Sequence, residues 1–225
     1  MLGQLHAADL TVVMFRPDEP EALATLPCVT SPERFDAAYY RRFYGRGPVH
    51  DRRRVGQLAS GVTALMSWWR IPVRSVLDVG AGKGHWREWL SMHLPSVRYH
   101  GLEISPHAAH RYRHELADIA TWTTRRRFDL AICQSVLQYL DDDAARAAVA
   151  TLGRVTRGIA MVEVPTLADR ADIIDPARTD LDVHWRTGDW YRALMDDAFV
   201  EIGAGLWLSR SCPVPFFELE RSRTS

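Results

Sequence analysis

Short apolar runs alternate with amphipathic stretches over most of the chain after Val73. Runs of four to eight apolar residues without polar alternation are typical of buried parallel strands, whereas apolar residues recurring every three to four positions favour helices. Strands are expected at residues 76–79, 97–104, 114–117, 128–134 and 158–164, and helices at 86–94, 141–153 and 190–195. A closing pair of strands is expected at 199–208 and 214–219. Alternating strands and helices predict an α/β fold whose parallel sheet is covered by helices on both faces.

The first 72 residues have a different pattern. Residues 1–31 contain Pro17, Pro20 and Pro27 and are interpreted as an N-terminal arm of uncertain structure. One helix is expected from Ser31, with Pro32 in its first turn, to Tyr44, and a second over residues 55–69. The predicted organisation is an N-terminal arm and helical cap over 1–72 and a core over 73–225, with a polar insertion at 165–187.

Composition narrows the class of protein. The chain has 225 residues, 47% of them hydrophobic, and a formal net charge of +0, which argues against a general electrostatic grip on nucleic acid. The arginine runs 52–54 and 125–127 are short enough to be solvated surface. The three cysteines are isolated, so neither a zinc site nor a disulfide framework is indicated, and no metal site is predicted. No apolar run reaches the ~18 residues of a membrane span, and no secretory signal is evident, so a cytoplasmic protein is expected.

The glycine-rich stretch 75–84 carries the clearest chemical signal. A predicted strand leads into Gly80, Gly82 and Gly84, and a predicted helix follows at once. Glycines let a ligand approach the backbone, and the helix N-terminus offers free N–H groups, so the unit is suited to a nucleotide-like ligand. A dinucleotide fingerprint requires G-x-G-x-x-G, but here the spacing is G-x-G-x-G and His85 takes the place of the third glycine. Asp78 lies two residues before the first glycine.

This D-x-G-x-G-x-G pattern resembles the first motif of class I S-adenosylmethionine (SAM) dependent methyltransferases. The stretch 128–140 resembles the fourth motif of the same family, and the resemblance extends over residues 73–219. It implies a doubly wound, mostly parallel seven-stranded Rossmann-like sheet, an N-terminal helical cap over the cofactor, and SAM as that cofactor. Gln134-Ser-Val-Leu is not the Asn/Asp-Pro-Pro-Tyr/Phe signature of enzymes that methylate adenine or amide nitrogen.

The candidate cofactor residues come from several predicted elements. Glu103, at the end of the second strand, can accept hydrogen bonds from ribose hydroxyls, although a solvated strand-end carboxylate is the alternative. The resemblance implies that Asp118 meets the adenine amino group and that Ile119 packs on the ring, with Asp118 as a turn cap as the alternative. The expected cofactor-binding residues are Asp78, Gly80, Gly82, Gly84, Glu103, Asp118, Ile119, Gln134 and, from the cap, Tyr40 and Tyr44.

The expected reaction transfers a methyl group to an oxygen or nitrogen of a small-molecule acceptor. His184 in the insertion is the candidate base, because imidazole titrates near neutral pH, and Glu163 or Asp182 could orient it. The alternative is that His184 is a surface or capping residue, which is the more frequent role of a histidine in a polar loop. Trp185 and Tyr139 are the candidate acceptor contacts.

Two other functions are alternatives at this point. One is a non-catalytic SAM- or nucleotide-binding module, and the other is an RNA or protein methyltransferase. A homo-oligomer is compatible with any of these functions. An NAD-linked oxidoreductase is disfavoured by the glycine spacing.

Overall fold

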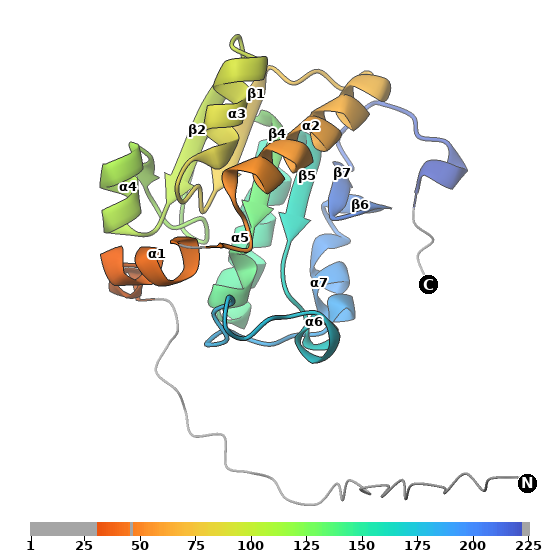
Figure 1. Cartoon of the computed structure of the whole chain (residues 1–225). Coiled ribbons are helices and arrows are strands. Elements are labelled where there is room, and N and C mark those ends of the chain that lie inside the picture. The colour runs from red at the N-terminus through yellow and green to blue at the C-terminus, as the bar shows by residue number, and fades with distance from the viewer. Residues whose placement is uncertain (1–30, 46, 222–225) are drawn as a thin grey trace, which may run out of the picture.

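The computed structural model describes residues 31–45 and 47–221, so the predicted arm over residues 1–30 lies outside the described part. Its centre is a seven-stranded sheet with the order β3-β2-β1-β4-β5-β7-β6 (Figure 1). The strands are β1 (Ser75–Val79), β2 (Arg98–Glu103), β3 (Glu115–Leu116), β4 (Phe128–Gln134), β5 (Thr156–Glu163), β6 (Phe199–Gly203) and β7 (Leu206–Ser209). Pairs among β1 to β5 are parallel, whereas β7 runs antiparallel to β5 and β6. The predicted mostly parallel seven-stranded sheet is therefore confirmed.

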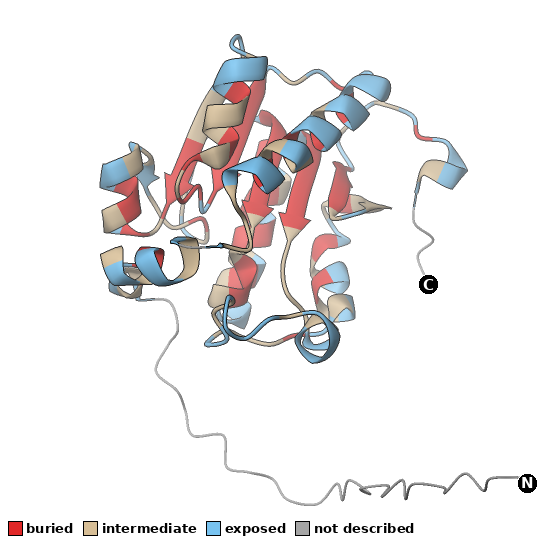
Figure 2. Cartoon of the chain, in the orientation of Figure 1, coloured by how far each residue is buried: buried red, intermediate tan, exposed pale blue. Residues whose placement is uncertain are grey.

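The central strands are buried on both faces, which explains why their sequences lack polar alternation (Figure 2). Leu130 and Ile132 of β4 pack on one face and Ala131 and Cys133 on the other. The first face is covered by α2 (Arg52–Trp68) and α3 (His85–His93), and the second by α5 (Asp142–Val155) and α7 (Gly188–Met195). Each face thus has its own apolar core.

The two N-terminal helices, α1 and α2, lie in different parts of the fold. α1 (Ala37–Tyr44) lies at the end of the sheet toward which the parallel strands point (Figure 1). α2 instead packs against α3 and buries Val55, Val62 and Met66 against the sheet. The expectation that both helices form the cap is therefore wrong, because the apolar stripe of α2 is part of the core layer.

The predicted helix from Ser31 to Tyr44 is broken into two pieces. A short 3₁₀ turn, η1 (Pro32–Arg34), ends at Phe35, and Asp36 then starts α1 by accepting hydrogen bonds from the N–H groups of Ala38 and Tyr39. An aspartate in the N-cap position favours a new helix start over continuation of the old one.

The C-terminal strand prediction also needs correction. The expected strand 199–208 is a hairpin, because Gly203, Ala204 and Gly205 all have positive φ and reverse the chain between β6 and β7. Residues 214–219 form no strand but lead into η3 (Glu218–Glu220). Pro213 and Pro215 remove backbone donors there, which disfavours pairing within a sheet.

The remaining connections are short. α4 (Pro106–Tyr112) fits between β2 and β3, η2 (Leu137–Tyr139) follows β4, and α6 (Leu167–Asp172) lies inside the insertion predicted at 165–187. None of the described helices is long and apolar enough to cross a membrane. Within residues 31–45 and 47–221, no group of three or more His, Cys, Asp or Glu side chains could hold a metal ion.

Candidate functional site

A cavity of about 70 Å³ lies at the carboxyl ends of β1, β2 and β4, beneath α1. This is the edge of a doubly wound sheet where ligands bind. The lining residues are Phe35, Tyr39, Tyr40, Tyr44, Val79, Gly80, Leu102, Glu103, Ile104, Ala117, Asp118, Ile119, Gln134, Ser135, Val136, Tyr139 and Leu140. Of the expected cofactor residues, Asp78, Gly82 and Gly84 are not in this lining.

The glycine loop between β1 and α3 is left-handed at all three glycines, with φ of 67° at Gly80, 51° at Gly82 and 76° at Gly84. A Cβ atom on Gly80 would lie 2.4 Å from Val136 Cγ2, so that glycine is required by packing. A Cβ atom on Gly82 would meet nothing closer than the Gly80 carbonyl oxygen at 3.7 Å. The loop therefore leaves space at Gly82 into which a ligand can come close to the backbone.

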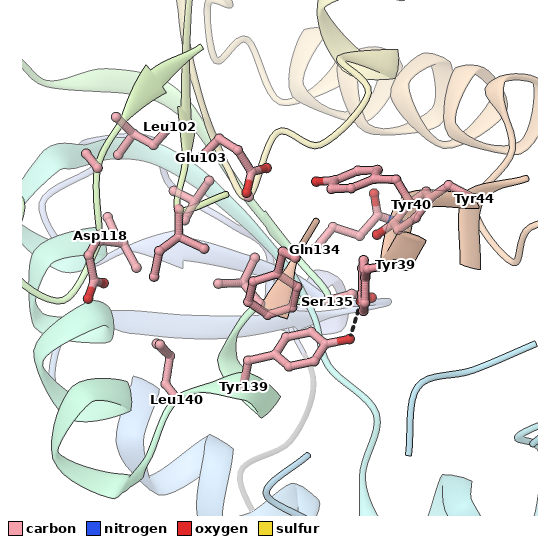
Figure 3. A pocket seen from close by; sticks show the side chains of 17 residues that line it. Tyr39, Tyr40, Tyr44, Leu102, Glu103, Asp118, Gln134, Ser135, Tyr139 and Leu140 are labelled. Atoms are coloured by element: carbon pink, nitrogen blue, oxygen red, sulfur yellow. Dashed lines mark hydrogen bonds between the residues drawn. The ribbon is translucent and has the colours of Figure 1, made fainter. Parts of the chain in front are cut away.

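Glu103 is the best-anchored acid of the cavity. Its carboxylate accepts hydrogen bonds from the N–H groups of Gly82 at 2.8 Å and Ser105 at 2.9 Å, and from the Tyr40 hydroxyl. Burial raises the pKa of Glu103 above its ordinary value, although these donors oppose the rise. Figure 3 shows the carboxylate pointing toward Tyr40 across the cavity. Glu103 therefore ties the glycine loop, the start of α4 and the cap to one point.

Asp118 and Ile119 follow β3 and form another side of the cavity. Asp118 Oδ1 accepts a hydrogen bond from the Ala120 N–H at 2.9 Å, as a turn cap does. Ile119 is buried and packs in the same core cluster as Leu102 and Leu140. The two residues thus combine one carboxylate with an apolar wall, and the capping role of Asp118 coexists with its place in the cavity.

Asp78 does not reach the cavity. It is 2% exposed and accepts a hydrogen bond from the Tyr99 hydroxyl at 2.6 Å, behind the glycine loop. Its position on β1 turns its side chain toward the face covered by α2 and α3, because Val79 and Leu77 face the other way. The expectation that Asp78 directly contacts the cofactor is therefore not supported. Burial raises the pKa of Asp78 to about 7.

Asp78 should make stability fall as pH rises. Because its pKa of about 7 in the folded protein exceeds its ordinary value of 3.8, the folded state holds a proton that the unfolded chain releases between about pH 4 and pH 7. The contribution of Asp78 to the free energy of unfolding is fully present below about pH 4 and is lost as the pH rises to about 7. It amounts to at most ~4 kcal/mol. Asp78→Asn should remove it, as measured by urea unfolding at pH 5 and pH 8.

Burial lowers the pKa of His114 to about 4, so His114 makes stability rise with pH, opposite to Asp78. The pH dependence of the wild-type unfolding free energy therefore does not isolate the effect of Asp78. The useful quantity is the difference between wild type and Asp78→Asn. An Asn variant with the same pH dependence of unfolding as the wild type would contradict a buried, proton-holding Asp78.

Aromatic side chains of the cap close the cavity. The Tyr39 and Tyr139 hydroxyls are hydrogen-bonded at 2.8 Å, and Tyr40 stacks on Tyr44 with ring centroids 5.1 Å apart (Figure 3). The cap is held from both sides, because Lys83 Nζ donates to the Tyr44 carbonyl and Arg34 pairs with Asp180 at 2.7 Å. Burial raises the pKa of all four tyrosine hydroxyls, so they act as neutral hydrogen-bonding groups.

A second cavity of about 450 Å³ adjoins the first. It lies between the cap, the end of β5 and the insertion that carries α6. Tyr39, Tyr44, Ser135 and Tyr139 line both cavities. The other residues that line the second cavity are Phe43, Val49, His50, Arg54, Gln138, Glu163, Val164, Pro165, Asp169, Ile173, Ile174, Asp175, Arg178, Thr179 and Asp180. Its size lies within the usual range for small-molecule sites, ~300–1,000 Å³.

A hydrogen-bonded group of side chains stands between the cavities. His50 Nε2 lies 3.1 Å from Glu163 Oε1 and 3.3 Å from Ser135 Oγ, and Gln134 Nε2 donates to Glu163 Oε2 at 2.8 Å. Ser135 has φ of 57°, a backbone conformation that non-glycine residues adopt rarely and often at functional sites. Burial alone would raise the pKa of Glu163, but the His50 and Gln134 contacts lower it below its ordinary value.

His184 and Trp185 lie outside both cavities, contrary to expectation. The His184 N–H donates to the Gln138 carbonyl at 2.8 Å, and its buried Nε2 has no hydrogen-bond partner among the described residues. Trp185 Nε1 donates to the Leu181 carbonyl, and the ring stacks under Arg170. The neighbouring Arg186 explains this placement. Its guanidinium is buried and donates to the carbonyls of Leu137 and Leu140, which pulls the segment against η2 and away from the cavity mouth.

Glu163 is thus the one candidate catalytic residue that lines a cavity, and its histidine partner is His50 rather than His184. No sequence signal marks His50, since it stands just before the Asp51 N-cap of α2 and meets β5 only in three dimensions.

Residues 77–158 match the protein family described as a methyltransferase domain. A trans-aconitate 2-methyltransferase from Methylobacterium radiotolerans is 27% identical over 139 residues, covering 57% of this chain and 52% of that protein. The chain therefore spans about half the length of the curated relative it matches.

Solved structures share the fold. Magnesium protoporphyrin IX methyltransferase from Synechocystis, solved with bound SAM, has a TM-score of 0.53 and 18% identity, covering 80% of this chain and 89% of that one. DesVI from Streptomyces venezuelae has a TM-score of 0.55 and 19% identity, covering 76% of this chain and 95% of that one. The amino pentose methyltransferase CalS10 from Micromonospora echinaspora, solved with SAM, has a TM-score of 0.53 and 18% identity, covering 77% of this chain and 96% of that one.

Proposed function

We propose that this chain, a member of the class I SAM-dependent methyltransferase family, transfers the methyl group of SAM to an oxygen or nitrogen of a small-molecule acceptor. The observation that carries the proposal is the pair of joined cavities at the carboxyl edge of the sheet, which share Tyr39, Tyr44, Ser135 and Tyr139. A transferase of this kind needs two ligands side by side, with the reacting atoms meeting where the two sites touch.

The chemistry of the first cavity fits SAM. Glu103 offers a carboxylate at the strand end for the ribose hydroxyls, and Asp118 with Ile119 offers an acceptor and an apolar face for adenine. The space at Gly82 lets the amino-acid end of the ligand approach the backbone. Because the cavity measures about 70 Å³ and Tyr40 already bonds Glu103, binding requires α1 and its tyrosines to move outward. Gly80, Gln134, Tyr40 and Tyr44 line the same space.

SAM, when bound, supplies a methyl group on a positively charged sulfur, which a nucleophile can displace in line. The protein's own part is to align the acceptor and to exclude water. The Tyr39–Tyr139 pair, at the junction of the cavities, is suited to holding the acceptor with neutral hydrogen bonds. This retains Tyr139 as a candidate acceptor contact and does not retain Trp185.

A small-molecule acceptor is supported by the size of the second cavity and by the proteins that share the fold. Those proteins are named for magnesium protoporphyrin IX and an amino pentose, and the curated relative is named for trans-aconitate. All three are small organic molecules, whereas the net charge of +0 gives no support to a nucleic-acid acceptor. The oligomeric state and the cytoplasmic location stay predictions.

Methyl transfer can be measured as formation of S-adenosylhomocysteine from SAM in the presence of probe acceptors that carry hydroxyl, amine or carboxylate groups. We expect product with at least one probe class and none without acceptor. Tight SAM binding with no transfer to any probe would favour the non-catalytic binding module instead.

A further inference from the structure

We infer that His50 is the general base of the methyl transfer, that Glu163 positions it, and that the acceptor atom is therefore a hydroxyl or amine rather than a carboxylate. The inference rests on the proposed function. His50, which lines the second cavity, thus takes the role expected from the sequence for His184, which lines neither cavity.

The hydrogen bonds around His50 fix which ring nitrogen can accept a proton. Trp86 Nε1 can only donate, and it donates to Gln134 Oε1 at 3.2 Å, so the Gln134 amide nitrogen faces Glu163 and His50. The Glu163 carboxylate can only accept, so His50 Nε2, 3.1 Å away, carries the hydrogen. Nδ1 is then the nitrogen with the lone pair, and its neighbour is the Gln134 amide at a long 3.4 Å.

This leaves Nδ1 weakly engaged beside a residue that lines the first cavity. Gln134 ends β4 at the first cavity, whereas His50 and Glu163 line the second. The Nδ1 lone pair therefore lies at the junction, where the acceptor atom has to meet the methyl group, and only the long Gln134 contact competes for it. The His50 side chain is 25% exposed, so an acceptor can reach it without unfolding the loop between α1 and α2.

Other groups at the junction are less suited to taking a proton. Burial raises the pKa of the Tyr39 and Tyr139 hydroxyls, which keeps them protonated. Glu163 has a lowered pKa, so as a base it is weak, but as a fixed negative charge it stabilises an imidazolium. This division of roles matches a histidine base oriented by a carboxylate.

The charges of the second cavity bear on the acceptor. Its lining contains Glu163, Asp169, Asp175 and Asp180 against Arg54 and Arg178. The Arg178 guanidinium keeps its charge while it donates to the carbonyls of Gly47 and Pro48, and Asp180 is already paired with Arg34. Three acids then face two arginines, so a polycarboxylate would meet an excess of negative charge, whereas a neutral hydroxyl compound or an amine would not be repelled.

The base gives a second reason for the same acceptor class. A carboxylate acceptor is already deprotonated at neutral pH and needs no base, whereas a hydroxyl or an amine must lose a proton. In the step, the acceptor oxygen or nitrogen forms a bond to the methyl carbon as the carbon–sulfur bond breaks, and that electron pair stays on sulfur. The acceptor proton moves to His50 Nδ1, and the resulting imidazolium is paired with Glu163.

The ring state can be tested without an acceptor. The 225-residue chain has nine histidines, and after ¹⁵N labelling of these residues His50→Gln identifies the His50 signals by their loss. We expect the neutral His50 ring to be protonated on Nε2 and unprotonated on Nδ1. A ring protonated on Nδ1 would overturn the inference, whatever the acceptor is.

Kinetics test the role and the acceptor class together. The probes are catechol as a hydroxyl acceptor, benzylamine as an amine, tyramine, which carries both groups, and benzoate and trans-aconitate as carboxylates. We expect transfer to hydroxyl or amine probes only. His50→Gln should lower that turnover ~10²–10⁴-fold and remove the acidic limb of the pH–rate profile. Glu163→Gln should lower kcat more than it changes KM, because it removes the negative charge that stabilises the imidazolium formed in the step. His93→Gln, at the exposed end of α3, is the matched control and should change neither.

The charged groups that share the cavity with His50 are Arg54, Asp169, Asp175, Arg178 and Asp180 in addition to Glu163. Because none of them is altered in these variants, a change in the pH profile reports on the pair itself. Transfer to carboxylates alone, to no hydroxyl or amine probe, or undiminished turnover in His50→Gln would each overturn the inference. SAM affinity, measured on the same samples, separates these results from failure of the proposed function, which would appear as no SAM binding.

Discussion

Glu103→Ala is expected to weaken SAM binding by ~1.5–3 kcal/mol, which is ~10- to 150-fold in the dissociation constant. The reason is the loss of a charge-assisted acceptor for the ribose hydroxyls at the end of β2. Isothermal calorimetry with SAM measures the effect directly. Unchanged affinity would remove Glu103 from the cofactor site.

The structure shows that Glu103→Ala should also lower folding stability, which the position of Glu103 at the end of a predicted strand does not indicate. Glu103 accepts hydrogen bonds from the Gly82 and Ser105 N–H groups, and both donors would lose their partner in the alanine variant. We therefore expect the variant to be less stable as well, by ~1–3 kcal/mol for each donor left unsatisfied in a buried place. Glu103→Gln keeps the shape and one carbonyl oxygen, so it should lose affinity with a smaller loss of stability, and it separates the two effects.

Gly82→Val is expected to lower SAM affinity by at least ~100-fold. A Cβ atom here meets only the Gly80 oxygen at 3.7 Å and the Tyr40 hydroxyl at 3.8 Å, so the side chain enters space that the folded protein leaves open. The positive φ of 51° adds ~1–2 kcal/mol of strain for a non-glycine residue, which most domains tolerate. The main effect should therefore be to block a ligand from the backbone, as measured by calorimetry on the folded variant.

Gly203→Val is the control for backbone strain, and a stringent one, because the φ of 112° at Gly203 suits a valine less well than the 51° at Gly82. Gly203 has open space around its Cβ position and lies in the β6–β7 hairpin, away from both cavities. A Cβ atom on Gly82, in contrast, would lie 3.8 Å from the hydroxyl of Tyr40, which lines the first cavity. The Gly203→Val protein should be less stable than the wild type and should keep its affinity for SAM. A Gly82→Val protein that binds S-adenosylhomocysteine normally would mean that the glycine loop is only a tight turn.

The sheet could be predicted because its signal is local. β4 matches the predicted range 128–134, and β1 extends the predicted one by one residue, since buried strands are continuous apolar runs that end at glycine or polar residues. The hairpin between β6 and β7 was not predicted, because the apolar pattern continues through Gly203 and Gly205, whose positive φ values reverse the chain.

The strand-end residues of the cofactor cavity could also be predicted, because parallel strands bring their carboxyl ends to one edge. Glu103, Asp118 and Gln134 lie there, far apart in sequence and together in space. The prediction that Asp78 binds the cofactor fails because the position of a residue within the strand, and not its distance from the glycines, decides which way its side chain faces. Its alternation with Val79 turns it toward Tyr99.

The residues of the second cavity depend on tertiary packing, which the sequence does not encode locally. His50 reaches Glu163 only because α1 and α2 bring the loop between them to the end of β5. His184 looked suitable by residue type and by nearness to Glu163 in sequence. The buried Arg186, two residues on, holds that segment against η2 instead.

Calorimetry of the whole 225-residue chain with SAM, S-adenosylhomocysteine and NAD in turn tests whether the cavity beneath α1 is a SAM site. We expect one site per chain for SAM and S-adenosylhomocysteine, with affinity lost in Gly82→Val and kept in Gly203→Val, and no heat of binding with NAD. Binding of NAD but not SAM, or no binding of any of the three by the folded wild-type chain, would contradict a SAM site there.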